Sequence, residues 1–141
     1  MNRIYLSRRI GVAISFLFLL IGFAIYLLFR PTSLLMFHWL DVLRLSSWIL
    51  IFRETFRYLP MPDWMIYNLP FALWMLSSMI LIDSIWADSK SNWRYIYIWI
   101  IPTIALGSEF FQFLGWIPGT FDLDDVLILL FCAIFFIRRN I

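Results

Sequence analysis

The stretch that decides the fold lies near the start of the chain, at residues 10–29, and reads IGVAISFLFLLIGFAIYLLF. It contains no charged residue. A helix rises 1.5 Å per residue and the hydrocarbon core of a bilayer is about 30 Å thick, so a run of roughly 20 apolar residues is long enough to cross it. The stretch therefore predicts a membrane-spanning helix.

The composition of the whole chain supports this interpretation. Of its 141 residues 63% are hydrophobic and 14% are charged, and the mean hydropathy is +0.86. A soluble domain of this length buries too little surface to hide so many apolar side chains. We expect residues 1–141 to form a single all-α membrane domain with the lipid bilayer as its main partner. The basic residues lie at the borders of the apolar runs, which gives no indication of nucleic-acid binding.

Three more apolar runs occupy residues 67–86, 95–116 and 123–137. The first two are long enough to span a bilayer, and Asn68 with Pro70 is a plausible helix start in the first of them. The third is shorter and spans only with little tilt or in a thinned bilayer. Together with residues 10–29, they predict four transmembrane helices.

The segment at residues 33–52, SLLMFHWLDVLRLSSWILIF, has the length of a span but carries His38, Asp41 and Arg44 near its middle. A charge at the centre of a span costs about 2.5–3.5 kcal/mol on insertion scales. On a helical wheel the polar residues of the segment fall within one half, with Ser46 alone outside it. This pattern predicts one amphipathic helix that lies in the outer membrane interface.

The distribution of basic residues predicts the orientation. With four spans and a cytoplasmic N-terminus, seven Lys and Arg residues face the cytoplasm and four face outward, as the positive-inside rule requires. If residues 33–52 were a fifth span, the loops would divide five to five and Arg44 would lie in the membrane. We therefore expect a multi-pass protein with both termini in the cytoplasm.

The main functional candidates lie in residues 108–125, SEFFQFLGWIPGTFDLDD. Glu109 is seven residues before Trp116, and hence about 10 Å deeper along a helix. An ionisable group at that depth is a candidate functional residue. Gln112 projects from the same face at i+3. After the turn, Asp122 and Asp125 are again three residues apart, so we expect both to lie close to Glu109 and Gln112.

Basic partners for these acids come from the other outer segment, in Arg30 and Arg44. Arginine suits phosphate or carboxylate, and clustered carboxylates suit a cation or an ammonium group. The sequence thus predicts a polar pocket that opens outward, with acids on one wall and arginines on the other. It contains no metal-ligand motif, phosphate-binding loop or nucleophile elbow, so we expect no cofactor and no metal.

Each candidate also has a purely structural interpretation. Asp122 suits the N-cap of the last helix. Glu109 can be a protonated or arginine-paired packing residue. Arg30 can anchor the end of the first span in the interface, and Asp41 with Arg44 can be an intrahelical pair at i, i+3.

Three quoted segments carry a resemblance to a known family: RPTSLLMFHW after the first span, YNLPFALWMLSS, and SEFFQFLGWIPGTFDLDD. The chain resembles the VanZ-like membrane proteins, which have four spans, a Glu-x-x-Gln pair late in the third and a G-T-x-D-x-x-D turn into the last. The matching positions are Asn68, Glu109, Gln112, Gly119, Thr120, Asp122 and Asp125. The family's frequent N-x-x-G-x-x-x-G continuation is missing here, where the last span reads LILLFCAIFFI.

The resemblance implies a bacterial inner-membrane protein, in a family named for a teicoplanin-resistance protein. We expect a non-enzymatic protein that binds an envelope ligand, a lipid or a cell-wall precursor headgroup, in the outer pocket. One alternative is a small structural subunit that docks a larger membrane protein. Another is an intramembrane lipid-modifying enzyme with a carboxylate as general base, for which the sequence supplies no nucleophile.

Overall fold

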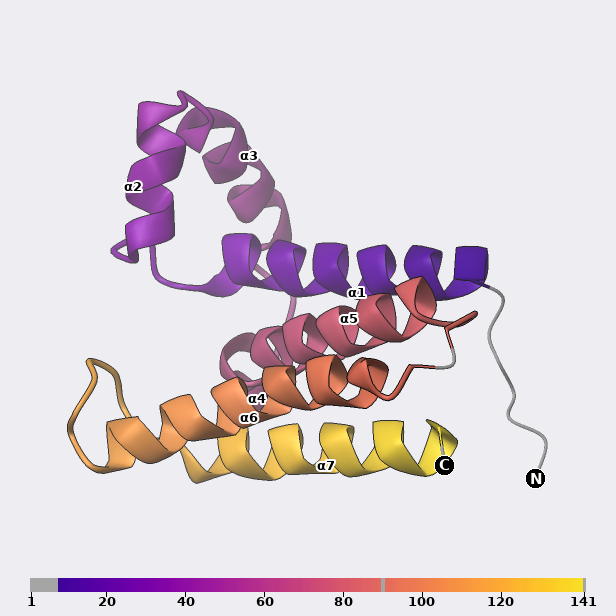
Figure 1. Ribbon diagram of the computed structural model, residues 1–141. Coiled ribbons are helices and arrows are strands. Elements are labelled where there is room, and N and C mark those ends of the chain that lie inside the picture. The colour runs from indigo at the N-terminus through magenta and orange to yellow at the C-terminus, as the bar shows by residue number, and fades with distance from the viewer. Residues whose placement is uncertain (1–7, 90, 141) are drawn as a thin grey trace.

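The structure is a computed structural model that describes residues 8–89 and 91–140, apart from the side chains at the end of the last helix. These residues form helices and no strand, which confirms the all-α prediction (Figure 1). The helices are α1 (Arg8–Phe29), α2 (Leu35–Val42), α3 (Ser46–Phe56), α4 (Asp63–Tyr67), α5 (Leu69–Ile85), α6 (Trp93–Phe113) and α7 (Leu123–Asn140).

Four long helices, α1, α5, α6 and α7, run alongside one another with alternating direction (Figure 1). The α5–α6 connection lies at the end of the bundle where α1 begins and α7 ends. The short helices α2 and α3 and the α6–α7 turn lie at the opposite end. The bundle therefore has two distinct ends, and the candidate residues of the α6–α7 turn belong to the end that carries α2 and α3.

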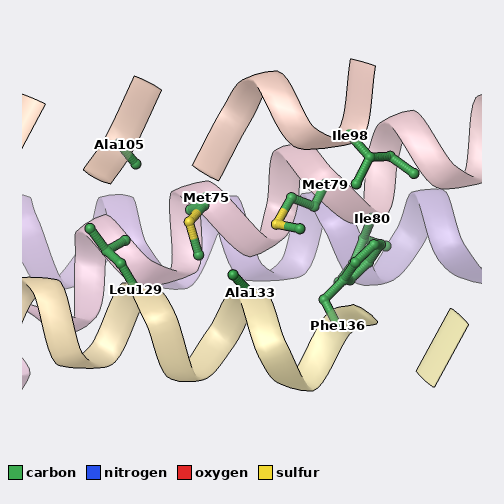
Figure 2. Packing of buried hydrophobic residues seen from close by; sticks show 8 residues of the cluster. All are labelled: Met75, Met79, Ile80, Ile98, Ala105, Leu129, Ala133 and Phe136. Atoms are coloured by element: carbon green, nitrogen blue, oxygen red, sulfur yellow. The ribbon is translucent and has the colours of Figure 1, made fainter. Parts of the chain in front are cut away.

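Helix α5 is the centre of the bundle, because it packs against α1 on one side and against α6 and α7 on the other. Apart from Ser77 and Ser78, it is apolar around its whole circumference up to Asp83, as expected for a helix surrounded by others. Figure 2 shows the buried cluster that it forms with its neighbours. The cluster consists of Met75, Met79 and Ile80 from α5, Ile98 and Ala105 from α6, and Leu129, Ala133 and Phe136 from α7.

Small residues allow α1 and α5 to approach closely. Ser15 and Ser77 are both buried, and each hydroxyl donates to the backbone carbonyl of the other residue at 2.9 Å. On the same face of α1, Gly22 lies so close to Trp74 that an added Cβ would be 2.8 Å from the indole Nε1. Small residues and hydroxyl pairs of this kind are typical of packed membrane helices.

The prediction of one helix at residues 33–52 is wrong, because the segment forms α2 and α3 with a sharp turn between them. Arg44 adopts a left-handed conformation with φ 58°. Its N–H bonds to the Asp41 carbonyl and the N–H of Leu45 bonds to the Leu40 carbonyl, both at 2.9 Å, which is the Schellman pattern that ends a helix. The Ser46 hydroxyl then donates to the Asp41 carboxylate across the turn.

Arginine side chains fix both ends of the fold. At the end that carries α2 and α3, Arg53 of α3 donates to the Leu27 carbonyl in the last turn of α1 at 2.5 Å. This bond satisfies a carbonyl that the helix end leaves free. At the other end, the buried Arg94 at the start of α6 forms an ion pair with the partly buried Asp83 near the end of α5.

Among the described residues, α1 and α6 are long and apolar enough to cross a membrane, which points to membrane association of the chain. Helix α6 ends at Phe113 rather than at the expected residue 116. Gly115 has φ 70° and forms a second Schellman turn, in which the Trp116 N–H bonds to the Phe111 carbonyl and the two rings stack at 5.6 Å. Helix α5, at 17 residues, is shorter than these two.

Candidate functional site

A cavity of about 470 Å³ lies at the end of the bundle that carries α2, α3 and the α6–α7 turn. Its walls come from the end of α1, the start of α5, the end of α6, and the turn that leads into α7. Its lining residues are Tyr26, Arg30, Leu34, Tyr67, Pro70, Phe71, Trp74, Ser108, Glu109, Gln112, Gly119, Thr120, Asp122 and Asp125. Five of the seven predicted site residues therefore line one cavity.

Asn68 does not line the cavity, but it hydrogen-bonds to two of the acids that do, Asp122 and Asp125. Its side chain is 3% exposed, and its amide nitrogen donates to Asp122 Oδ2 at 3.1 Å and to Asp125 Oδ1 at 3.0 Å. Asn68 precedes α5, whereas both acids begin α7, so these bonds join two helices that are distant in sequence. The predicted site residue Asn68 thus positions carboxylates rather than lining the cavity.

Asp122 is also the N-cap of α7, which confirms the structural interpretation of this residue. Its Oδ1 accepts the Asp124 N–H at 2.9 Å, and its backbone carbonyl accepts the Val126 N–H. The Asp122 N–H in turn donates to Glu109 Oε2 at 3.4 Å. In a capping box this N–H meets a side chain from the same helix; here the acceptor comes from α6 and fixes the α6–α7 turn.

Glu109 is 3% exposed and lines the cavity. Among the described residues it has no basic partner within ion-pair distance, and its other carboxylate oxygen accepts no hydrogen bond. The arginine-paired interpretation of Glu109 is therefore wrong within the described part of the chain. The free oxygen is not among the buried atoms without a partner, so it is accessible from the cavity.

Gln112 packs against the backbone of Gly119 across the turn. A Cβ added at Gly119 would lie 2.7 Å from the Gln112 amide, and Gly119 has φ 140°, a conformation that other residues rarely adopt. The glycine therefore serves both the turn and the close approach of Gln112. Together these contacts place Glu109, Gln112, Asp122 and Asp125 on adjoining parts of one surface.

Arg30 forms the basic part of the cavity at the end of α1. Its guanidinium carbon lies 4.9 Å from the ring centroid of Tyr67 and 5.5 Å from that of Tyr26. These cation–π contacts stabilise the positive charge but do not neutralise it. Arg30 is close enough to Asp125 for their charges to interact. However, no carboxylate of the described residues lies within ion-pair distance of it, and its buried Nε has no acceptor among them.

The structure contradicts the prediction that Arg44 shares this site. Arg44 is exposed in the turn between α2 and α3 and does not line the cavity. The prediction assumed one helix with its polar residues on one face, and the left-handed turn at Arg44 breaks that register. The basic wall therefore consists of Arg30 among the described residues that line the cavity.

Four aromatic lining residues, Tyr26, Tyr67, Phe71 and Trp74, were not among the predicted site residues. Tyr26 lies four residues before Arg30, a spacing at which side chains of one helix meet. Trp74 is well inside its apolar run, away from the membrane borders where tryptophan is common. Its ring lies 5.5 Å from that of Tyr26, and its buried Nε1 has no acceptor among the described residues. The spacing of Tyr26 from Arg30 and the position of Trp74 inside its run were signals that could have identified these two residues.

The geometry provides a polar cavity with fixed carboxylates on one side and a cation over aromatic rings on the other. We call Glu109, Asp122 and Asp125 the acidic wall. Glu109 and Asp125 each keep one oxygen without a hydrogen bond among the described residues. Comparison of the chain with protein-family models, with curated proteins and with solved structures found no match.

Proposed function

We propose that the chain is a VanZ-like, four-span protein of the bacterial inner membrane that binds an envelope ligand by its headgroup in this cavity. The observation that carries the proposal is the separation of charges. The acidic wall and Arg30 line the same cavity, yet among the described residues no ion pair joins them. Opposite charges fixed apart in a partly buried cavity favour a ligand that satisfies them.

The four-span topology is supported by length and by the surface of the bundle. Helix α1 is about 33 Å long and α6 about 31 Å, close to the thickness of the hydrocarbon core. Helix α7 is about 27 Å long, and α5 is extended by α4, which precedes it with only Asn68 between them. Large apolar side chains such as Phe16, Leu20 and Phe131 are more than half exposed, as expected for helices in lipid.

The position of the bundle across the membrane is supported by its two ends. Trp64 and Trp116 lie at the end that contains the cavity, and Trp93 lies at the opposite end; each is about half exposed or more. Such positions are typical of the two membrane interfaces. With both termini in the cytoplasm, the cavity opens at the outer leaflet, where lipid and precursor headgroups lie.

The resemblance to VanZ-like proteins is supported by where its motif residues lie. Glu109, Gln112, Gly119, Thr120, Asp122 and Asp125 all line the cavity, and Asn68 holds two of them. These positions come from two separate helices and the turn between them. Their convergence on one cavity is what a motif that forms a binding site would produce.

Native mass spectrometry of the protein released from nanodiscs made of a bacterial lipid extract tests the proposal. We expect a lipid-sized adduct on the wild type and its loss in Glu109→Gln. This substitution preserves the shape of the side chain and an oxygen that can accept the Asp122 N–H. The matched control is Asp124→Asn, which removes an exposed carboxylate outside the cavity and should retain the adduct.

Two results would contradict ligand binding. Identical spectra without an adduct would favour a structural subunit, and capture of a stoichiometric membrane protein would then support that alternative. Conversion of a labelled lipid, abolished by Glu109→Gln while the adduct remains, would favour a lipid-modifying enzyme.

A further inference from the structure

We infer that the ligand of this cavity carries a zwitterionic headgroup, with a primary ammonium against the acidic wall and a phosphate against Arg30. The inference rests on the proposed function and adds the chemical class of the ligand. Phosphoethanolamine has this chemistry, either as the headgroup of a membrane lipid or as a free soluble compound.

The acidic wall favours an ammonium group because its free acceptors come from different helices. Glu109 of α6 and Asp125 of α7 each have one oxygen without a donor among the described residues. A primary ammonium has three N–H donors and can bond to separate oxygens at once. Glu109 is 3% exposed and lines the cavity, so an ammonium group in the cavity can donate to its free oxygen and stabilise the carboxylate form.

A metal ion fits the acidic wall less well than an ammonium group. Among the described residues, no three His, Cys, Asp or Glu side chains are placed so that they could hold one metal ion. Two oxygens of the wall are also already occupied by the Asn68 amide, which would compete with a metal for them. An organic cation needs no such convergence of ligands.

Arg30 favours an anionic group on the same ligand. Its guanidinium is held over two tyrosine rings and lies near Asp125, yet it has no ion pair among the described residues. Arginine recognises phosphate through several N–H donors in one plane. A cavity of about 470 Å³ lies within the range of small-ligand sites and is large enough for both charged groups.

The test uses the full chain in phosphatidylcholine nanodiscs that contain equal small amounts of phosphatidylethanolamine and phosphatidylglycerol, read by native mass spectrometry. Phosphatidylcholine keeps the phosphate but its quaternary ammonium has no N–H donor, and phosphatidylglycerol lacks the ammonium. We expect the phosphatidylethanolamine adduct to be enriched at least about tenfold over the others relative to their abundance.

Both Glu109→Gln and Arg30→Ala should remove this enrichment. Their matched controls, Asp124→Asn and Arg44→Ala, change exposed charges outside the cavity and should retain it. Thermal unfolding of all four variants confirms that each is folded. A second arm adds soluble glycerophosphoethanolamine to protein in detergent. Displacement of the lipid adduct at equal concentration assigns the site to a free compound, and no displacement assigns it to the lipid. Both results support a zwitterionic ligand.

Two results would overturn the inference and leave the proposed function standing. One is an adduct that depends on Glu109 but shows no preference among the three lipids. The other is a phosphatidylethanolamine adduct that Arg30→Ala leaves unchanged, since the anionic group would then have no role. Absence from the wild type of any lipid adduct and of any glycerophosphoethanolamine adduct would overturn both.

Discussion

Substitution of Asn68 tests how the acidic wall is built. Its amide donates to Asp122 at 3.1 Å and to Asp125 at 3.0 Å, and the residue is 3% exposed. Asn68→Ala removes both bonds and leaves the two carboxylates close together without a shared donor. Because these bonds link the start of α5 to the start of α7, we expect the substitution to weaken the packing of α7 on the bundle.

The magnitude follows from the number and environment of the bonds. A hydrogen bond to a charged group contributes about 1.5–3 kcal/mol, which gives about 3–6 kcal/mol for two. Both carboxylates are only half-buried, so water in the cavity replaces part of the loss, and polar pairs between membrane helices often contribute less. We therefore expect Asn68→Ala to lower the free energy of unfolding by about 2–3 kcal/mol.

Unfolding with SDS in mixed micelles, followed by circular dichroism, measures this change. Asn92→Ala is the matched control, because Asn92 is exposed and its side chain forms no hydrogen bond in the described part of the chain. It should change the free energy of unfolding by less than about 0.5 kcal/mol. If the two substitutions cost the same, Asn68 does not support the acidic wall and the reasoning about the site is wrong.

The same unfolding assay checks three further predictions. Gly22→Ala should destabilise the protein by about 1–2 kcal/mol, because the added Cβ would lie 2.8 Å from Trp74 Nε1. Its control, Gly107→Ala, has open space around the added Cβ and should be neutral or stabilising. Equal effects would refute the close α1–α5 contact. Asp83→Ala should cost about 3–5 kcal/mol by leaving the buried Arg94 without this partner, and a loss below about 1 kcal/mol would contradict a structural ion pair. Arg44→Gly should be at least as stable as the wild type and Arg44→Val should lose about 1 kcal/mol or more; the opposite order would refute the left-handed turn.

The length of the apolar runs identified the helices, because a long apolar segment in lipid has few ways other than a helix to hydrogen-bond its backbone N–H and C=O groups. Residues 10–29 and 95–116 correspond to α1 and α6, with end shifts of at most three residues. Helix α6 ends earlier than predicted because Gly115 enables a Schellman turn before Trp116. The sequence marked this stop with a glycine, but apolar residues continued past it.

The segment at residues 33–52 was predicted less well, since a helical wheel assumes an unbroken helix. Ser46, the polar residue that did not fit the wheel, was the local sign of a break. The turn also depends on a left-handed Arg44, which no propensity indicates. The amphipathic pattern was therefore informative about the environment of the segment but not about its continuity.

The acidic half of the site was predictable because its members are close in sequence. The i, i+3 spacings of Glu109 with Gln112 and of Asp122 with Asp125 placed each pair on one face, and the turn joins them. The contact of Asn68 with both aspartates spans more than 50 residues and depends on how α5 and α7 pack. The role of Arg30 depends in the same way on Tyr67, which lies on another helix.

An experimental structure of the wild-type protein in a nanodisc of bacterial lipids tests the central claim most directly, because it shows what lies between Arg30 and the acidic wall. We expect density for a bound headgroup in the cavity, in contact with Glu109 on one side and with Arg30 on the other. A cavity closed by a direct ion pair between Arg30 and Asp125, with no density between them, would contradict it.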